Sequence, residues 1–88
     1  MDEILKTQIA ENFGNTQLGY IRIRRNLHIE KLSDIETEHF LREIIIATPL
    51  DDIETRGKNH YFVCARYNAI LTINAHSLTV ITAKTIQV

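Results

Sequence analysis

The sequence predicts an α+β domain in which three N-terminal helices pack on a C-terminal three-stranded antiparallel meander. Apolar residues recur at helical spacing up to about residue 48, and Pro49 follows directly. From residue 60 onward the chain is rich in Val, Ile, Thr, Tyr and Phe, which favour strands. The 88 residues, 44% hydrophobic and 24% charged, suit a single domain over residues 1–88 with one core.

The first helix is predicted over residues 2–13. Leu5, Ile9 and Phe13 fall on one apolar stripe, and charged side chains occupy the other positions. Gly14 then suits the left-handed position that follows a helix end.

The second helix is predicted over residues 17–27, with Thr16 as its N-cap. Its apolar residues form two faces: Tyr20, Ile23 and Leu27 on one side, Leu18 and Ile21 on the other. A helix that is apolar on two sides is either sandwiched in the fold or uses one side for an interface.

The third helix is predicted over residues 34–48. Ser33 and Glu36 form a capping-box pattern at its start, and Pro49 disfavours helix in the residue before it. Its core stripe consists of Phe40, Leu41, Ile44 and Ala47, and Ile45 and Ile46 widen it.

Residues 51–57 are expected to form a connector with room for a short extended stretch. The three strands of the meander are then predicted over residues 60–66, 69–75 and 78–86. Two dipeptides, Tyr67–Asn68 and His76–Ser77, separate these strands and are short enough for hairpin turns.

The net charge of −1 conceals an asymmetry. Residues 1–55 carry eleven acidic and six basic residues, whereas residues 56–88 carry four basic residues and no acid. A sheet of one charge sign would attract anions at its surface, although acidic helices and a basic sheet also attract each other within a fold.

Three features favour a cytoplasmic protein. Cys64 is the one cysteine, so it has no partner for an internal disulfide. The first residues lack the basic stretch and apolar run of a signal peptide. The longest apolar run, Ile44–Ala47, is far too short to cross a membrane.

The hairpin turns suggest a candidate site at one end of the sheet. If Tyr67–Asn68 is a two-residue turn, His60 pairs with Ala75 and the first strand starts beside the second turn. Six polar residues then gather there, with His60, His76, Lys58 and Ser77 as catalytic candidates and Asn74 and Asn59 as binding candidates. Two histidines, a cation and hydrogen-bonding groups suffice for metal-independent cleavage of RNA through its 2′-hydroxyl.

The alternative for this cluster is structural, because Asn, His, Ser and Lys are ordinary residues of turns and strand ends. A similar choice applies to Arg22 and Arg25, which lie one helical turn apart. They either bind a phosphate or carboxylate, or pair with Glu30, Asp34 or Glu36 within the fold. No His or Cys pair has metal-ligand spacing, so we expect neither a metal nor another cofactor.

Three ordered segments resemble a known family: Leu18–Leu27, Gly57–Tyr61, and Thr72–Ser77 together with Val80–Ala83. The family comprises small bacterial proteins, typical of Firmicutes, and is classed as a domain of unknown function. The resemblance covers about residues 16–86 and implies no activity. A weaker, fold-level likeness is to the toxin nucleases grouped as barnase/EndoU/colicin/RelE-like, which also have leading helices and a terminal antiparallel sheet.

Two functions remain open at this point, and whether the protein is an enzyme stays open with them. The first is a metal-independent ribonuclease-like toxin or RNA-binding protein that uses a basic sheet. The second is a non-enzymatic inhibitor or interaction protein, of bacterial or phage origin, that binds a larger protein or nucleoprotein complex. A homodimer that pairs the sheet edge at residues 78–88 is a further option.

Overall fold

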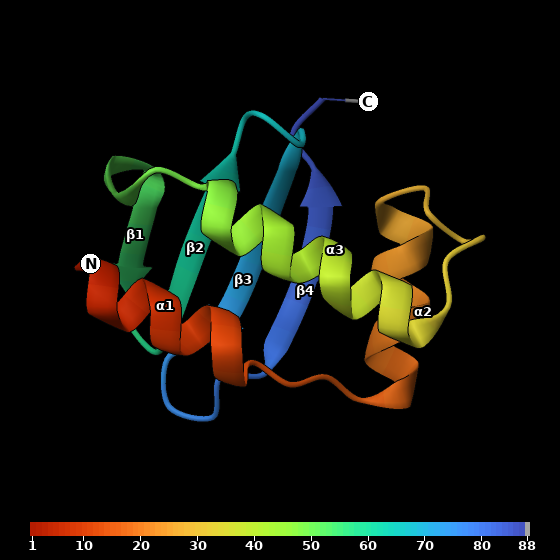
Figure 1. Ribbon diagram of the computed structural model, residues 1–88, viewed down its shortest axis with the longest axis horizontal. Coiled ribbons are helices and arrows are strands. Elements are labelled where there is room, and N and C mark those ends of the chain that lie inside the picture. Colours follow the sequence, from red (N-terminus) through yellow and green to blue (C-terminus); the bar gives the residue numbers. More distant parts are fainter. Residues whose placement is uncertain (88) are drawn as a thin grey trace.

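The computed structural model describes residues 1–87 and confirms the α+β class, with three N-terminal helices and an antiparallel sheet (Figure 1). The elements are α1 (Glu3–Asn12), α2 (Gln17–Asn26), α3 (Asp34–Ala47), the 3-10 helix η1 (Leu50–Asp52), β1 (Ile53–Arg56), β2 (Asn59–Cys64), β3 (Ala69–Asn74) and β4 (Val80–Thr85). The three helices and the three expected strands begin and end within two residues of their predicted bounds. Within residues 1–87, none of the helices has the length and apolar character needed to cross a membrane.

The sheet has four strands in the order β1-β2-β3-β4, so the prediction of three strands was wrong by one. The missed strand, β1, lies in the segment expected to be a connector. Among its four residues only Ile53 is buried, so its sequence resembles that of a polar loop. β1 pairs with β2 through a tight turn in which Gly57 has a φ of 58°, a left-handed conformation that glycine adopts without steric cost.

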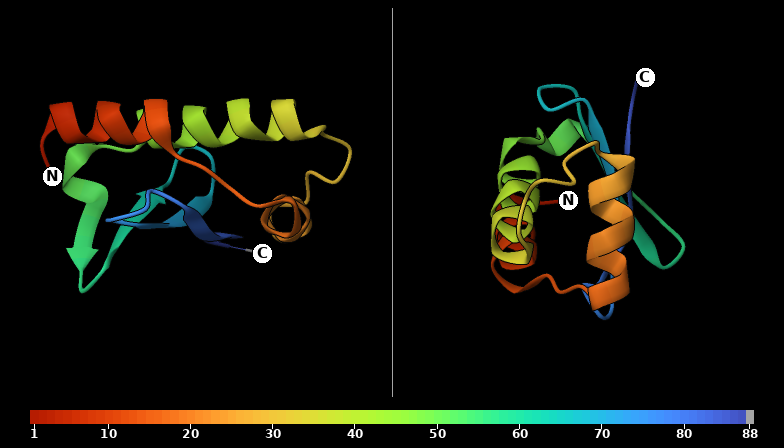
Figure 2. Two further views of the ribbon diagram at one scale, coloured as in Figure 1. Left: turned by 90° about the horizontal axis from the view of Figure 1, so that it is seen from below. Right: turned by 90° about the vertical axis from the view of Figure 1, so that its right-hand side faces the viewer.

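The helices cover one face of the sheet. Figures 1 and 2 show α1 and α3 side by side over this face, while α2 lies along the edge formed by β4. The core fills the space between the sheet and the layer of α1 and α3. Its fully buried members are Ile9, Leu41, Ile44, Ile45, Phe62, Cys64, Ala69, Leu71, Ile73 and Ala83. No helix of residues 1–87 covers the opposite face, which we call the open face (Figure 2).

The pairing of β2 with β3 is shifted by two residues from the expected register. His60 lies opposite Ile73 rather than Ala75, because the turn contains four residues instead of two. In this turn the amide of Asn68 donates to the carbonyl of Ala65 at 3.1 Å, and Asn68 has a φ of 52°. Since side chains alternate between faces along a strand, a shift of two residues leaves each side chain on its expected face.

The sheet edge expected to pair with a second copy, residues 78–88, is partly occupied in this fold; Val88 lies outside the described residues. The carbonyl of Leu78 accepts from the amide of Gly14, and the amide of Val80 donates to the carbonyl of Gly14, both at 3.0 Å. α2 also packs against β4. The edge with fewer neighbours is therefore β1, at the other side of the sheet.

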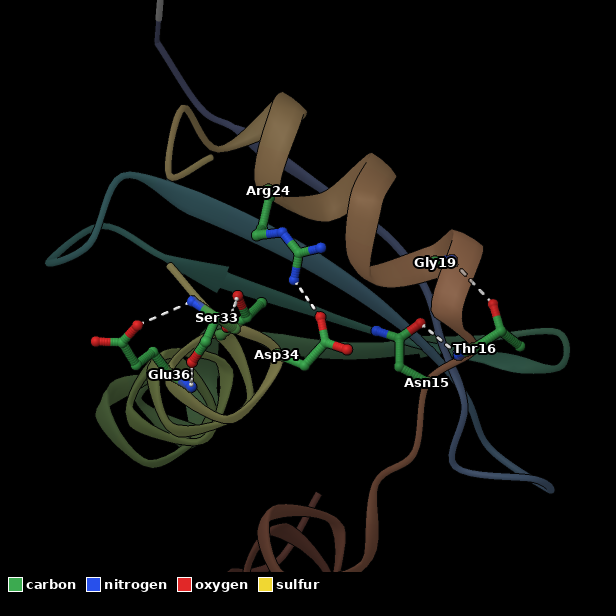
Figure 3. A network of polar contacts seen from close by, with 8 residues as sticks. Asn15, Thr16, Gly19, Arg24, Ser33, Asp34 and Glu36 are labelled. Atoms are coloured by element: carbon green, nitrogen blue, oxygen red, sulfur yellow. Dashed lines mark hydrogen bonds and ion pairs between the residues drawn. The ribbon is translucent and has the colours of Figure 1, made fainter. Parts of the chain in front are cut away.

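The predicted capping box at the start of α3 is present (Figure 3). The amide of Glu36 donates to the Ser33 hydroxyl at 3.1 Å, and the Ser33 amide donates to the Glu36 carboxylate at 2.9 Å. The hydrogen bond from the Ser33 amide, together with the Ser33 hydroxyl beside it, lowers the pKa of the Glu36 carboxyl.

We expect Ser33→Ala to lower the free energy of unfolding by about 1 kcal/mol, because the first turn of α3 loses a hydrogen-bond acceptor. Urea unfolding measured by circular dichroism tests this. Gln8→Ala, at an exposed position within α1, is the control and should change the stability by less than about 0.5 kcal/mol. Equal stability of the Ser33→Ala variant and the wild type would show that the cap contributes nothing.

Candidate functional site

The structure brings together the two turns that were predicted to form a site at the end of the sheet. The amide of Ala75 donates to the carbonyl of Lys58 at 2.8 Å, and Asn59 lies opposite Asn74 in the paired strands. The backbone grouping is therefore present, in spite of the shifted register. Lys58 is exposed, while the side-chain oxygen of Asn59 is buried and has no hydrogen-bond partner within residues 1–87.

Asn74 and Ser77 hold the turn between β3 and β4. The Oδ1 atom of Asn74 accepts hydrogen bonds from the amides of His76 and Ser77 at 2.9 and 2.8 Å, and from the Ser77 hydroxyl at 3.2 Å. The Ser77 hydroxyl in turn accepts from the amide of Thr79 at 3.3 Å. These contacts are those of an Asx turn, in which side chains replace backbone partners. His76 lies exposed in the same turn.

His60 is in a different environment from His76. Along β2 the buried side chains alternate, so His60 faces the helix layer together with Phe62 and Cys64, and it is only 5% exposed. Its Nδ1 atom lies 2.7 Å from the Thr55 hydroxyl on the neighbouring strand. Burial lowers the pKa of the His60 imidazole, and the positive charge of the amino terminus lowers it further. A substrate at the surface of the turn would meet His76 but not the His60 ring.

We expect the lowered pKa of His60 to make stability depend on pH. The unfolded chain binds a proton at His60 near pH 6.5, whereas the folded chain binds it only at lower pH. The contribution of neutral His60 is therefore complete above pH 6.5 and is lost as the pH falls through the folded-state pKa.

Urea unfolding of the wild type and His60→Gln between about pH 8 and pH 5 tests this dependence, because glutamine keeps a hydrogen-bonding group but does not titrate. The wild type should lose more stability than the variant as the pH falls below 6.5. Parallel pH profiles for the two proteins would contradict the prediction.

The internal ion pair that was the alternative to an anion site for Arg22 and Arg25 is not made by either arginine within residues 1–87. Arg24, and neither Arg22 nor Arg25, contacts Asp34 at the start of α3, with 2.5 Å between the guanidinium and the carboxylate (Figure 3). Within residues 1–87, no ion pair involves Arg22 or Arg25, and both side chains are exposed. An ion pair between α2 and α3 therefore exists, but Arg24 makes it instead of Arg22 or Arg25.

The acids of α3 are largely engaged within the fold. Asp34 pairs with Arg24, Glu36 completes the capping box, and Glu38 lies 3.9 Å from Arg42 one turn along the helix. Of the four acids of α3, Glu43 alone has no such contact within residues 1–87.

The open face of the sheet is a second candidate surface, which the sequence alone did not reveal. Because the strands pair in register, one row across the sheet contains Glu54, Tyr61, Thr72 and Thr82, and the next contains Val63, Ile70 and Lys84. These side chains border a hollow of about 680 Å³, together with Asp51, Asp52, Arg56 and Asn26 at the end of α2. The hollow is open to solvent, since the helices lie on the other side of the sheet (Figure 2).

Charge is divided across this hollow. On the β1 side the three acids Asp51, Asp52 and Glu54 outnumber the one base, Arg56, whereas Lys84 lies on β4 at the opposite edge. The open face is therefore not uniformly basic, because the segment missed as a strand adds its acids to the sheet. Between the charged sides lie Val63, which is 39% exposed, and the half-buried Ile70.

An arginine and a tyrosine form the polar end of the hollow. The guanidinium of Arg56 stacks 4.3 Å from the centre of the Tyr61 ring and lies 3.2 Å from the carboxylate of Glu54. Arg56 therefore covers one face of the tyrosine ring. The sequence did contain a signal for two different faces of β2, since Tyr61 and Val63 alternate with His60, Phe62 and Cys64. This alternation did not show which face the helices cover.

The part of the chain that the structure describes contains no group of three or more His, Cys, Asp or Glu side chains close enough to hold a metal ion. The acids beside the hollow belong to η1 and β1 and do not form such a group.

A comparison with protein families identifies the family of this chain. The family described as "Protein of unknown function (DUF3781)" matches residues 7–84, which is most of the chain, so the chain belongs to this family. The match confirms the resemblance to a family of unknown function. No curated protein and no solved structure matches the chain, so the predicted likeness to toxin nucleases has no support from a known structure.

Proposed function

We propose that this member of the DUF3781 family is a non-enzymatic binding protein that holds a segment of a protein partner in the hollow of its open sheet face. One observation carries the proposal. The helices leave one face of the four-stranded sheet uncovered (Figure 2). This open face has an apolar floor between an acidic and a basic side. An apolar centre with a polar rim is the usual composition of a protein–protein interface.

The distribution of charge favours a polypeptide over RNA as the occupant. Every phosphate of a nucleic acid is negative, and Asp51, Asp52 and Glu54 would repel the strand along the β1 side. Stacking of a base on Tyr61 would also have to compete with Arg56, which already covers the ring. A polypeptide can carry both charge signs and bury apolar side chains against Val63 and Ile70.

A ribonuclease-like activity has less support from the geometry. Such a reaction needs a base and an acid at the same phosphate. His60 is buried against the helix layer, and Asn74 and the exposed Ser77 hold a turn. Lys58 and His76 are the exposed members of the cluster whose side chains have no such role within residues 1–87.

The test is capture of a partner by the immobilised protein from a lysate of the cells that produce it. We expect Val63→Lys to reduce the captured protein at least roughly tenfold, because a charge replaces the apolar floor of the interface. Ile35→Lys, which puts the same charge at an exposed apolar residue of α3, is the matched control and should retain capture.

The other functions give different results in the same set of proteins. A complex that disappears on treatment with ribonuclease, or binding of labelled single-stranded RNA that Val63→Lys removes, would replace the protein partner with RNA. Growth arrest with RNA cleavage, lost in the variant that combines His60→Ala and His76→Ala, would establish the nuclease instead. Capture that is equal in wild type, Val63→Lys and Ile35→Lys would overturn the binding site.

A further inference from the structure

The outward side of α2 is an apolar and basic stripe that nothing in the described chain covers. Leu18 is 56% exposed and Ile21 is 52% exposed. Arg22 and Arg25 are exposed beside them, and α2 contains no acidic residue. The four residues follow the spacing i, i+3, i+4, i+7, so they lie on one side of the helix. We call them the α2 stripe.

The other side of α2 is fixed to the domain. Ile23 is buried, Arg24 pairs with Asp34 of α3, and α2 packs against β4. The Thr16 hydroxyl caps the start of the helix by accepting from the amide of Gly19 at 2.9 Å (Figure 3). Because these contacts hold the helix in one orientation, the α2 stripe is presented without a cost in ordering the backbone.

A groove between α1 and α3 has the complementary character. It has a volume of about 420 Å³, and Ala10 and the exposed Ile46 supply its apolar surface. Glu3 and Glu11 are exposed at its border on α1. We call this the α1–α3 groove.

The two basic residues that also line this groove are partly withdrawn. Lys6 is buried, and the Nε atom of Arg42 donates to the carbonyl of Ala10 at 2.8 Å while its guanidinium stacks on Phe13. The charges that an approaching molecule meets first are therefore the two glutamates.

We propose that the α2 stripe of one molecule docks in the α1–α3 groove of another, so that copies of this chain associate head to tail. Leu18 and Ile21 enter the apolar groove, and Arg22 and Arg25 face Glu3 and Glu11 of the neighbour. This is recognition of a helix by a groove, with anchors one helical turn apart. Because the two contacting surfaces differ, each molecule keeps one free surface, and association can continue beyond a dimer.

Other occupants fit the α2 stripe less well. Two apolar side chains on a ten-residue helix offer little area for insertion into a membrane surface. A nucleic acid would be bound by the arginines but would leave Leu18 and Ile21 in water. A groove with an apolar surface and two exposed glutamates at its border uses both halves of the stripe, and this chain supplies one.

The experiment is sedimentation velocity at increasing protein concentration with two charge-reversed proteins. One carries Arg22→Glu and Arg25→Glu, and the other carries Glu3→Lys and Glu11→Lys. All four positions are exposed, so both proteins should fold, which circular dichroism checks. Each alone should associate at least roughly tenfold more weakly than the wild type, because like charges face each other across the contact.

Mixing the two reversed proteins supplies the decisive result. The acidic α2 stripe then meets a basic groove and the unmodified stripe meets an unmodified groove, so association should return in the mixture alone. Ile21→Asp should abolish association, whereas Ile35→Asp and Val63→Lys, which lie outside both surfaces, should leave it unchanged. The last variant separates this contact from the open face, so either proposal can fail alone.

Three results would overturn the head-to-tail contact. The first is a wild type that stays monomeric at every concentration, and the second is association that Ile21→Asp leaves intact. The third is a mixture that sediments no faster than its separate components. Binding to vesicles of anionic lipid that requires Arg22 and Arg25, without self-association, would assign the α2 stripe to a membrane surface instead.

Discussion

Replacement of Phe62 by alanine should lower the free energy of unfolding by about 3–5 kcal/mol, the largest effect we expect from a single change. The Phe62 side chain is fully buried at the centre of the sheet, with Ile53 opposite it on β1 and Leu71 opposite it on β3. Its removal leaves a cavity between the sheet and the helix layer. Since a domain of this kind is stable by about 5–15 kcal/mol, the loss is a large part of the total.

The adjacent Val63 is the matched control for this prediction. It lies on the same strand but points to the open face and is partly exposed, so Val63→Ala should cost less than about 1 kcal/mol. Urea unfolding of both variants, followed by circular dichroism, gives the comparison. Similar losses for the two would mean that both faces of the sheet are buried, and the open face would then not exist.

Replacement of Ile23 by alanine should lower the free energy of unfolding by about 2–4 kcal/mol. Ile23 is 2% exposed and is the buried residue of α2, a helix that lies at the edge of the sheet rather than over its core. The loss of stability should therefore be larger in α2 than in the rest of the domain, because α2 can separate from β4 while the sheet and α3 stay folded.

Hydrogen exchange measured by NMR distinguishes this local effect from a uniform one. In the Ile23→Ala variant, amides of α2 should exchange faster by a larger factor than amides of β2 and β3. Ile21→Ala, on the exposed side of the same helix, should change both the stability and the exchange little. Equal acceleration in α2 and in the sheet would show that α2 unfolds only with the whole domain.

Local sequence signals predicted most of the helical half correctly. The capping box at Ser33, the N-cap at Thr16 and the stop at Pro49 each act within one turn of chain, so their effect does not depend on the rest of the fold. The apolar stripes also identified much of the core, including Ile9, Ile23 and Leu41. Ile46 was expected to widen the stripe of α3 but is exposed, because α1 covers only part of that helix.

The candidate site was less predictable, because it depends on contacts between distant segments. The grouping of the two turns at one end of the sheet followed from the predicted hairpins, and the backbone hydrogen bond between Ala75 and Lys58 agrees with it. The sequence did not show that His60 faces the helix layer, or that the side chains of Asn74 and Ser77 form a hydrogen bond. A strand pattern gives two faces but does not say which of them the helices cover.

The sequence by itself determined the elements of this protein, because caps, turns and apolar periodicity act over a few residues. The tertiary structure alone decided which surfaces remain free. β1, the strand that was not predicted, gains its stability from pairing with β2 rather than from its own residues, and it brings Glu54 and Arg56 onto the open face. The placement of α2 beside β4 in turn leaves Leu18 and Ile21 exposed, since burial depends on what packs against a helix and not on its own pattern.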